Sequence, residues 1–276
     1  MYFTKYTGLG NDFVFLDGQT AQGVKNPGEL AVKLCDRRFG IGADGLILLL
    51  PSQTADVRMR IINSDGSEAE MCGNASRAVA LHMYRHGKIA KKNITLETLA
   101  GPILTEIIDE PVGLVRVNMG VPRLTRGEIP MTGDPSSFAQ KVPLEIDGHT
   151  WIGTGVSMGN PHFVIFVDDI KNVALEEVGP KIEKHALFPR KTNVEFVQVL
   201  DKKTVRMRVW ERGAGITSAC GTGACATAVA CVLNQKTDTQ VSVRLDGGTL
   251  RILWEDKKSV WMTGPAQEVF SGEILV

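Results

Sequence analysis

Apolar residues follow two periods along this chain, and the two periods come in alternating blocks. Short runs with alternating or clustered apolar residues predict β-strands, whereas apolar residues every three to four positions predict helices. In the first half the predicted strands lie at about 2–6, 11–17, 45–50, 57–62, 93–99, 102–108 and 113–119, and the predicted helices at about 28–36 and 73–87. Strands outnumber helices, which favours an α+β fold.

The second half of the chain repeats this order of elements. Its predicted strands lie at about 150–156, 162–168, 193–200, 204–211, 239–246, 249–254 and 258–263, and its predicted helices at about 171–185 and 221–234. In both halves a cysteine stands just before a helix that is followed and preceded by strands. The prediction is a mixed or antiparallel sheet wrapped around a central helix in each half.

The repetition extends to the residues themselves. Arg58-Met59-Arg60-Ile61 leads to Cys72-Gly73, and Arg206-Met207-Arg208-Val209 leads to Cys220-Gly221, an offset of 148 positions. Gly10-Asn11 likewise recurs as Gly159-Asn160. A period this long is unlike that of a solenoid and indicates duplication of a whole domain. Two homologous lobes are predicted, with an active site in the cleft between them.

The expected boundaries follow from turn-forming residues. The N-terminal lobe is predicted to span 1–118 and the C-terminal lobe 119–265, with the segment from about 266 to 276 packing back on the first lobe. The passage at 122–137 is rich in glycine and proline and has no apolar period. A chain of 276 residues is long enough for two such domains.

Charge narrows the class of partner. The 31 basic and 31 acidic residues cancel, so the sequence offers no excess of positive charge for nucleic acid or for an anionic membrane surface. A small neutral or zwitterionic ligand fits better. The longest apolar run, Leu46 to Leu50, is too short to span a membrane, and the N-terminus has no signal-peptide pattern. We therefore expect a cytoplasmic protein.

The five cysteines do not resemble a disulfide framework or a zinc site. They stand at 35, 72, 220, 225 and 231, an odd number with no C-x-x-C pair and no clustered histidines. We expect free thiols, no metal and no cofactor. Cys35, Cys225 and Cys231 lie within helical patterns and are interpreted as small core residues.

The two equivalent cysteines carry the candidate chemistry. Cys72 and Cys220 are each followed by small residues that begin a helix, where backbone amides can bind a carboxylate. A helix N-terminus also favours a thiolate, which is a competent base. One thiolate would remove the α-proton of a bound amino acid, and the opposite thiol would return a proton from the other face. A single cysteine here would more often be a buried small residue, but a symmetric pair favours catalysis.

The motifs resemble those of the diaminopimelate epimerase family over essentially the whole chain. They are Gly8-Leu9-Gly10-Asn11-Asp12-Phe13, Gly40-Ile41-Gly42-Ala43-Asp44-Gly45, Asn63-Ser64-Asp65-Gly66-Ser67, Met71-Cys72-Gly73-Asn74, Val115 to Gly120, Val156 to His162, Glu211-Arg212-Gly213-Ala214-Gly215 and Ala219-Cys220-Gly221-Thr222-Gly223. The resemblance implies cofactor-independent interconversion of LL- and meso-2,6-diaminopimelate, in the pathway to lysine and to peptidoglycan precursors.

The resemblance also implies roles for individual residues. Cys72 and Cys220 would be the catalytic acid/base pair, and His162 and Glu211 would lie close to the thiols. The implied substrate-binding residues are Asn11, Asn63, Gly73, Asn74, Asn160, Asn193, Glu211, Arg212, Gly221 and Thr222. These types suit a diamino dicarboxylic acid, because Arg212 can bind a carboxylate with two hydrogen bonds and asparagine oxygens can accept from an ammonium. A homodimer is compatible with the sequence.

Each role has a structural alternative. Asn11 and Asn160 follow glycines and could be turn residues. His162 precedes an apolar strand and could be a buried histidine without a role in the reaction. Glu211 and Arg212 could form a surface charge pair, and Arg77 could only brace its helix.

Three residues depart from the usual family pattern. Ala75 stands where many members have glycine, and we expect the fold to absorb the methyl group. Ile216 stands where a glutamate is usual, which removes a charge near the second thiol. Gly45 stands where some members have a glutamine that touches substrate, so that contact is lost.

Two glycine-rich segments of the sequence have the spacing of a nucleotide-binding loop. Gly40-x-Gly42-x-x-Gly45 has the spacing of a dinucleotide-binding loop, but a strand follows it instead of a helix. Gly221-x-Gly223-x-x-Ala226 opens a helix but lacks the acidic residue about 20 positions further on. A nucleotide-binding redox protein is therefore disfavoured. A non-catalytic binding module, or a two-thiol racemase of proline, hydroxyproline or histidine, stays open.

Overall fold

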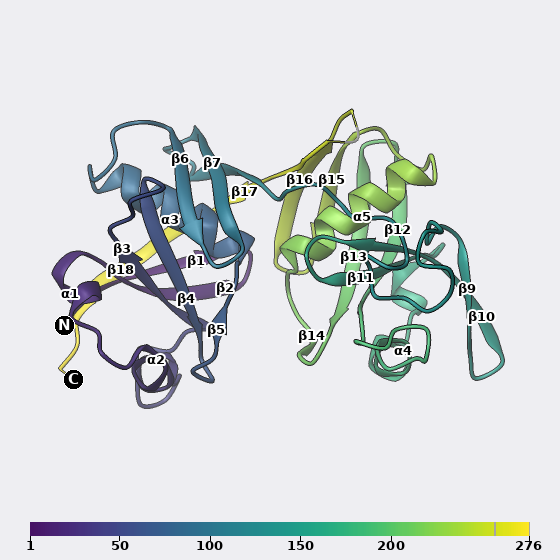
Figure 1. The fold of residues 1–276 in the computed structure, drawn as a ribbon, viewed down its shortest axis with the longest axis horizontal. Coiled ribbons are helices and arrows are strands. Elements are labelled where there is room, and N and C mark those ends of the chain that lie inside the picture. The colour runs from purple at the N-terminus through teal and green to yellow at the C-terminus, as the bar shows by residue number, and fades with distance from the viewer. Residues whose placement is uncertain (257, 276) are drawn as a thin grey trace. The chain divides into compact units, whose positions relative to one another are not determined.

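The computed structural model describes residues 1–256 and 258–275 of the chain and divides into two compact units (Figure 1). Unit 1 contains Met1–Asn118 together with the segment from Thr263 onward, and unit 2 contains Met119–Met262. The chain therefore leaves unit 1 once, builds unit 2 from a continuous stretch, and returns to unit 1 for its last strand.

Unit 1 is built from strands on either side of one long helix. Its strands are β1 (Tyr2–Gly8), β2 (Asn11–Leu16), β3 (Gly45–Leu50), β4 (Val57–Asn63), β5 (Glu68–Ala69), β6 (Asn93–Thr98), β7 (Gly101–Asp109), β8 (Leu114–Asn118) and β18 (Gln267–Glu273), and its helices are α1 (Gly18–Gln22), α2 (Pro27–Cys35) and α3 (Gly73–Arg85). Strand β17 (Val260–Pro265) carries the chain back into this unit.

Unit 2 has the same kind of construction. Its strands are β9 (Val142–Ile146), β10 (His149–Ser157), β11 (Pro161–Phe166), β12 (Asn193–Asp201), β13 (Thr204–Glu211), β14 (Gly215–Ile216), β15 (Gln240–Leu245) and β16 (Gly248–Trp254). Its helices are the 3-10 turn η1 (Ile170–Asn172), α4 (Leu175–Glu183) and α5 (Gly221–Leu233).

The two units share one strand topology. In unit 1 the neighbours run β18, β1, β2, β3, β4, β6, β7, with parallel pairing between β2 and β3 and between β4 and β6 and antiparallel pairing elsewhere. In unit 2 the neighbours run β9, β10, β11, β12, β13, β15, β16, and the two parallel pairs occupy the same places. The C-terminal strand β18 therefore fills in unit 1 the place that β9 fills in unit 2.

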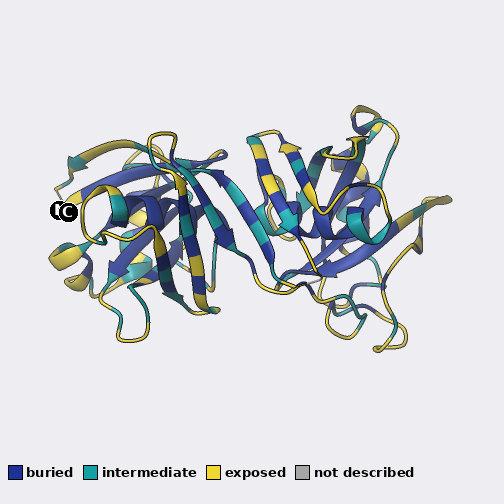
Figure 2. Ribbon diagram, turned by 90° about the horizontal axis from the view of Figure 1, so that it is seen from above, coloured by how far each residue is buried: buried dark blue, intermediate teal, exposed yellow. Residues whose placement is uncertain are grey.

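A buried central helix organises each unit. In α3, 11 of 13 residues are buried, from Gly73 to Met83, and in α5 the stretch from Gly223 to Cys231 is buried. Both helices are rich in alanine and other small residues, which lets the surrounding strands approach closely. Figure 2 shows buried residues on the inside of each unit and exposed residues along its loops. The predicted α+β architecture of two homologous halves is confirmed.

Several elements differ from the sequence prediction. The helix predicted at 171–185 is interrupted, because Val173 has extended backbone between η1 and α4. The predictions did not include α1, β5, β9 or β14, and they gave no strand to the C-terminal segment. The passage at 122–137 contributes Ile129 and Met131 to the buried core of unit 2, although it forms no helix or strand.

None of the helices in the described residues combines the length and the apolar composition that a membrane span requires.

Candidate active site

In unit 1 the candidate residues gather at one edge of the sheet. Asn11 begins β2, Gly45 begins β3 and Asn63 ends β4. Phe13 pairs with Gly45 and Gly45 pairs with Asn63, so these three strand ends lie at the same edge. The N-terminus of α3 meets this edge, because the side chain of Asn74 contacts that of Asn11.

Cys72 is the residue that caps α3. Its backbone is extended, with φ −142° and ψ 118°, and its carbonyl oxygen accepts hydrogen bonds from the Ser76 amide and hydroxyl, both at 2.9 Å. Gly73 and the following small residues then begin the helix. Because the first amides of a helix lack partners inside it, they are available to an anion next to the thiol.

A buried polar network fixes Asn74. Its amide nitrogen donates to Asn11 Oδ1 at 2.5 Å, and its oxygen accepts from Arg77 Nη2 at 2.7 Å. Arg77 is fully buried and also donates from Nε to the Pro265 carbonyl at 3.1 Å. Arg77 thus braces the helix, as the structural alternative proposed, and in doing so it sets the orientation of Asn74.

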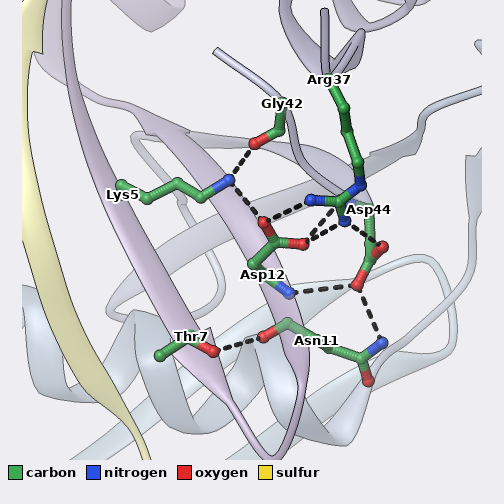
Figure 3. Close-up of polar contacts among 7 residues, drawn as sticks. All are labelled: Lys5, Thr7, Asn11, Asp12, Arg37, Gly42 and Asp44. Atoms are coloured by element: carbon green, nitrogen blue, oxygen red, sulfur yellow. Dashed lines mark hydrogen bonds and ion pairs between the residues drawn. The ribbon is translucent and has the colours of Figure 1, made fainter. Parts of the chain in front are cut away.

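Asn11 is held from the other side by a cluster of charged residues (Figure 3). Its amide nitrogen donates to Asp44 Oδ2 at 3.1 Å, and the Asp12 amide donates to the same oxygen at 3.1 Å. Arg37 bridges the Asp12 and Asp44 carboxylates, and Lys5 pairs with Asp12 at 2.7 Å. Partial burial alone would raise the pKa of Asp12, but hydrogen bonds from Arg37 and Lys5 hold it below its usual value.

Asn63 stands apart from these contacts. Its amide nitrogen donates to Ser67 Oγ at 2.9 Å and its backbone amide to the Ser67 carbonyl at 2.8 Å. Its neighbour across the sheet, Gly45, could not be a larger residue without a shift, because a Cβ there would lie 3.0 Å from the Ile62 carbonyl oxygen. A side chain at Gly45 would therefore need the facing strand β4 to shift by a few tenths of an ångström.

Unit 2 repeats this arrangement at the corresponding sheet edge. His162 on β11 pairs with Asn193 at the start of β12, and Glu211 ends β13. Cys220 caps α5 with extended backbone, φ −126° and ψ 109°, and its sulfur accepts a hydrogen bond from the Gly223 amide at 3.3 Å. A Cβ on Gly223 would lie 2.8 Å from Glu195 Oε1, so only glycine lets α5 approach this carboxylate so closely.

A chain of polar contacts leads from a buried carboxylate to the thiol. His162 Nδ1 lies 2.7 Å from Glu195 Oε1 and both side chains are fully buried. His162 Nε2 lies 3.0 Å from Asn160 Oδ1, and Asn160 Nδ2 donates to Thr222 Oγ1 at 3.3 Å. Thr222 Oγ1 in turn lies 3.5 Å from Cys220 Sγ.

The remaining candidates in unit 2 lie around the turn after β13. The Arg212 amide donates to Asn193 Oδ1 at 2.9 Å, and Thr217 donates to Glu211 Oε1 at 2.5 Å. Glu183 on α4 anchors this turn by accepting from Trp210 Nε1 at 2.7 Å and from the Gly213 amide at 3.2 Å. The Arg212 side chain is exposed, so its guanidinium is accessible to a ligand.

The thiol of Cys220 differs from the sequence expectation. Burial raises its pKa well above the usual value, and the carboxylates of Glu211 and Glu195 raise it further. The hydrogen bonds from Thr222 and Gly223 act in the opposite direction but are weaker. The helix N-terminus alone predicted a lowered pKa, and that prediction is wrong for Cys220 because desolvation and two acidic neighbours outweigh it.

The two units are not chemically equivalent around their thiols. In strand register, Phe13 and Ile47 of unit 1 correspond to His162 and Glu195 of unit 2. Asn74 and Ala75 likewise correspond to Thr222 and Gly223, and Asn63 corresponds to Glu211. Unit 2 thus carries two buried ionisable groups, His162 and Glu195, and the partly buried Glu211 where unit 1 carries apolar or neutral residues. Within the described part of the chain, no cluster of three His, Cys, Asp or Glu residues has the geometry of a metal site.

Glu195 was not identified from the sequence. It stands inside the apolar run Val194 to Val197, and a lone carboxylate in such a run is a signal for a paired buried charge. Asp44 belongs to the glycine-rich motif at 40–45, but its contact with Asn11 depends on the parallel pairing of β2 with β3. Neither contact follows from spacing along the chain.

Known proteins resemble this chain over nearly its whole length. A sequence model described as diaminopimelate epimerase matches residues 3–125 and 154–269. A diaminopimelate epimerase from Pelotomaculum thermopropionicum is 57% identical over 99% of this chain and 98% of its own length. Another, from Elusimicrobium minutum, is 53% identical over 99% of this chain and 98% of its own length.

Solved structures share the fold at lower identity. A phenazine biosynthesis protein of the PhzF family from Bacillus anthracis has a TM-score of 0.72 and 17% identity, with 100% of this chain and 99% of that one covered. A hydroxyproline epimerase from Agrobacterium vitis has a TM-score of 0.67 and 15% identity, with 99% and 91% covered. The sequence resemblance extends far beyond this common fold and confirms the prediction made from the motifs: the chain belongs to the diaminopimelate epimerase family.

Proposed function

We propose that this chain interconverts LL- and meso-2,6-diaminopimelate, with the thiols of Cys72 and Cys220 as the acid/base pair. Membership of the family supports the substrate. The observation that carries the mechanism is the equivalence of the two cysteines, each of which caps the buried central helix of its own unit. In both units the thiol stands beside the first amides of its helix, where a carboxylate can bind.

The proposed reaction needs no group besides the two thiols. One sulfur, as thiolate, takes the proton from the α-carbon and becomes a thiol. The other sulfur, as thiol, gives its proton to the opposite face of that carbon and becomes a thiolate. The centre is inverted, no net proton is consumed, and the two sulfurs have exchanged roles. Both thiols must reach the same α-carbon for this to occur.

The starting protonation follows from the surroundings of Cys220. Because burial and the carboxylates of Glu211 and Glu195 raise its pKa, Cys220 is a thiol in the resting state. We therefore assign Cys220 the role of proton donor in the first turnover and Cys72 that of base. Glu211 and His162 serve as the ionisable groups near Cys220.

The free amides at the two helix starts would hold the reacting carboxylate. Gly73 and Asn74 begin α3, and Gly221 and Thr222 begin α5, and the first backbone N–H groups of a helix have no partner within the helix itself. As the α-proton leaves, negative charge moves onto the carboxylate oxygens. Donors that are already in place stabilise this charge without reorganising, which lowers the barrier.

The remaining candidates would recognise the distal end of the substrate. Arg212 supplies a cation for the distal carboxylate, and amide oxygens together with Glu211 can accept from the distal ammonium. The asparagines assigned to this binding are Asn11, Asn63, Asn160 and Asn193. A simpler amino acid would leave these groups unpaired, so selectivity against it is expected. This activity belongs to the cytoplasmic synthesis of lysine and peptidoglycan precursors.

Hydrogen exchange at the α-carbon tests the proposal. Purified protein without added cofactor is incubated in D2O with LL-diaminopimelate, proline, hydroxyproline or histidine, and deuterium is measured by mass spectrometry. Deuterium should enter diaminopimelate together with meso product, and both signals should disappear in Cys72→Ala and in Cys220→Ala. Exchange into a different amino acid would retain the two-thiol mechanism and change the substrate. Exchange into none of them would refute the proposal.

A further inference from the structure

Glu195 is a buried carboxylate beside the second thiol, and no sequence motif points to it. It lies on β12 between Val194 and Phe196 and is fully buried. On the face of the sheet that α5 covers, its ionisable neighbours are His162 on β11, Glu211 on β13 and Cys220 at the start of α5. Only Oε1 has a hydrogen-bond partner within residues 1–256 and 258–275, and Oε2 has none.

The contacts from Glu195 to Cys220 form a chain with a definite direction. His162 Nε2 faces the oxygen of Asn160, so this ring nitrogen must carry a hydrogen. Asn160 donates its amide hydrogen to Thr222 Oγ1. The hydroxyl hydrogen of Thr222 is then free to point at Cys220 Sγ, 3.5 Å away. Every donor in this direction points toward the sulfur.

The opposite direction is also chemically conceivable and would deprive the sulfur of this donor. His162 would then carry its hydrogen on Nδ1, its Nε2 would accept from Asn160, and Thr222 would donate to Asn160 instead. In that state an ionised Glu195 faces a neutral imidazole, and the buried pair has a net charge of −1. In the direction that ends at the sulfur, one proton is shared between Glu195 Oε1 and His162 Nδ1, and the pair is neutral.

Charge decides between the two directions. A net negative charge in a buried site without a cation is strongly unfavourable, and here Glu211 and the developing Cys220 thiolate lie nearby. The neutral pair is therefore preferred, and with it the direction that aims Thr222 at the sulfur. The protonated nitrogen of a histidine is set by the hydrogen bond that the other nitrogen makes.

We propose that Glu195 is a positioning residue that keeps His162 protonated on Nε2 and so directs the polar chain through Asn160 and Thr222 toward the Cys220 thiolate. The position of the proton on His162 does not depend on the proposed function, whereas the expected effect on the reaction rate rests on it. Unit 1 has no such device, because Phe13 and Ile47 occupy the corresponding places. Glu195 also supplies a carboxylate near the second thiol in a chain that has Ile216 where the family usually has glutamate.

Nuclear magnetic resonance of protein labelled with ¹⁵N in its histidine rings reads the proton position directly. Of the 5 histidines, His162 is assigned by its loss in His162→Gln. In the wild-type protein, Nε2 of His162 should have the shift of a protonated nitrogen from pH 6 to pH 9. In Glu195→Gln the glutamine can donate to or accept from Nδ1 without any difference in charge, so Nε2 should show a mixture of protonated and unprotonated forms.

Steady-state kinetics measures how much the direction of the hydrogen bonds between His162 and Cys220 contributes to the reaction rate. In Glu195→Gln we expect kcat/KM for diaminopimelate to fall by about tenfold to a hundredfold, as is typical when a hydrogen bond involving a charged group is lost. Glu195→Asp keeps the charge and should recover part of the loss. Glu183→Gln is the matched control, since Glu183 is a buried carboxylate of the same unit that contacts Trp210 and Gly213. It should leave the His162 spectrum unchanged even if it lowers the melting temperature.

The outcomes separate this inference from the proposed function. An unprotonated Nε2 in the wild-type protein would overturn the inference whatever the variants do. An unchanged His162 spectrum in Glu195→Gln together with wild-type kinetics would overturn it as well. If the wild-type protein showed protonated Nε2 but left diaminopimelate unchanged, the positioning role would stand and the proposed function would fail. If Glu195→Gln did not fold, the wild-type spectrum alone would still decide where the proton lies.

Discussion

Gly223 and Ala75 occupy equivalent places in the two central helices, yet only one of them can carry a side chain. A Cβ on Gly223 would lie 2.8 Å from Glu195 Oε1 and 3.2 Å from Cys220 Sγ. Gly223→Ala should therefore displace the thiol or the carboxylate, and a displacement of about 1 Å can cost roughly a hundredfold in rate. We expect such a loss in kcat/KM together with a lower melting temperature, because overpacking a buried site costs about 1–3 kcal/mol and the better helix propensity of alanine offsets only about 1 kcal/mol.

Ala75→Gly is the control for this substitution. Ala75 is fully buried on α3, next to Asn74, and is not itself assigned to substrate binding. Its replacement should lower the free energy of unfolding by about 1 kcal/mol through helix propensity, with a further loss of similar size from removing a buried methyl group. Activity at a temperature where the protein is folded should stay within about twofold of the wild type. A larger loss in Ala75→Gly than in Gly223→Ala would contradict the assignment of the tight contact to unit 2.

Asp44 supports Asn11 without being a candidate for substrate contact itself. Its Oδ2 accepts from the Asn11 side chain and from the Asp12 amide (Figure 3). In Asp44→Ala the Asn11 amide loses its orientation, and KM for diaminopimelate should rise by about tenfold, the cost of a hydrogen bond to a charged group. Asp109→Ala, which removes an exposed carboxylate of the same unit, should leave KM unchanged. A fall in kcat with unchanged KM would instead place Asp44 in the chemical step.

The identity of these supporting residues could not be predicted from the sequence. Cys72 and Cys220 stood out because duplication repeats them, and repetition needs no knowledge of the fold. Glu195 is not repeated, since isoleucine takes its place in unit 1, and its partner His162 is 33 positions away on another strand. Pairing of parallel strands brings such residues together, and spacing along the chain does not reveal it.

At the scale of elements, local signals predicted the central helices well. The helices expected at 73–87 and 221–234 are observed at Gly73–Arg85 and Gly221–Leu233, because small residues after each cysteine start the helix and apolar residues bury it. The strands β9 and β18 were missed, and both fill the same edge position of their units. The residues of β18 are mostly exposed, so its apolar period is weak. Strand β9 does alternate buried and exposed residues, but over only five positions.

The far end of α3 contains a histidine that should make stability depend on pH. His82 is almost fully buried and contacts Asp17 Oδ2 at 2.9 Å. Its ring makes edge contacts with the rings of Tyr6 and Phe15 and a tilted contact with that of His86. Burial lowers its pKa more than Asp17 raises it. The unfolded chain therefore binds a proton on this residue at a higher pH than the folded chain does.

The sign of the effect follows from this lowered pKa. Between the unfolded value of about 6.5 and the lower folded value, the unfolded state holds more protons, so acidification favours unfolding by up to about 1.4 kcal/mol per pH unit. We expect the melting temperature to fall as pH drops below about 6.5. His82→Gln should reduce this slope, whereas His149→Gln, at an exposed position on β10, should leave it unchanged. Equal slopes in all three proteins would assign the effect to other groups.

At the scale of the whole molecule, duplication has preserved the topology and changed the chemistry. Both units keep the same order of parallel and antiparallel strand pairs. In each unit a cysteine caps the central helix, and the start of this helix lies next to one edge of the sheet. Only unit 2 carries the buried His162 and Glu195 and the acidic Glu211 near its thiol. The topology could be inferred from internal repetition, but the asymmetry depends on differences between the copies, which repetition does not explain. In the proposed reaction one thiol removes the proton from one face of the α-carbon and the other thiol donates a proton to the opposite face. The two thiols exchange these roles when the reaction runs in reverse.

This asymmetry and the use of both units can be tested together by following the isotope through one turnover. With two bases, the proton taken from LL-diaminopimelate stays on one sulfur while the product receives a hydrogen from the other. In D2O at early times the meso product should carry deuterium at the inverted centre, while the remaining LL substrate stays nearly unlabelled. A single base that serves both faces would return the original proton, and the early product would keep its hydrogen.

Because Cys220 is a thiol in the resting protein, the first product molecules should carry the hydrogen that Cys220 held. Protein equilibrated in D2O and then diluted into H2O with substrate should therefore transfer deuterium into the first turnover if substrate binding precedes exchange of that thiol. Product that retained substrate hydrogen would restrict the chemistry to one unit and leave the second cysteine without a catalytic role.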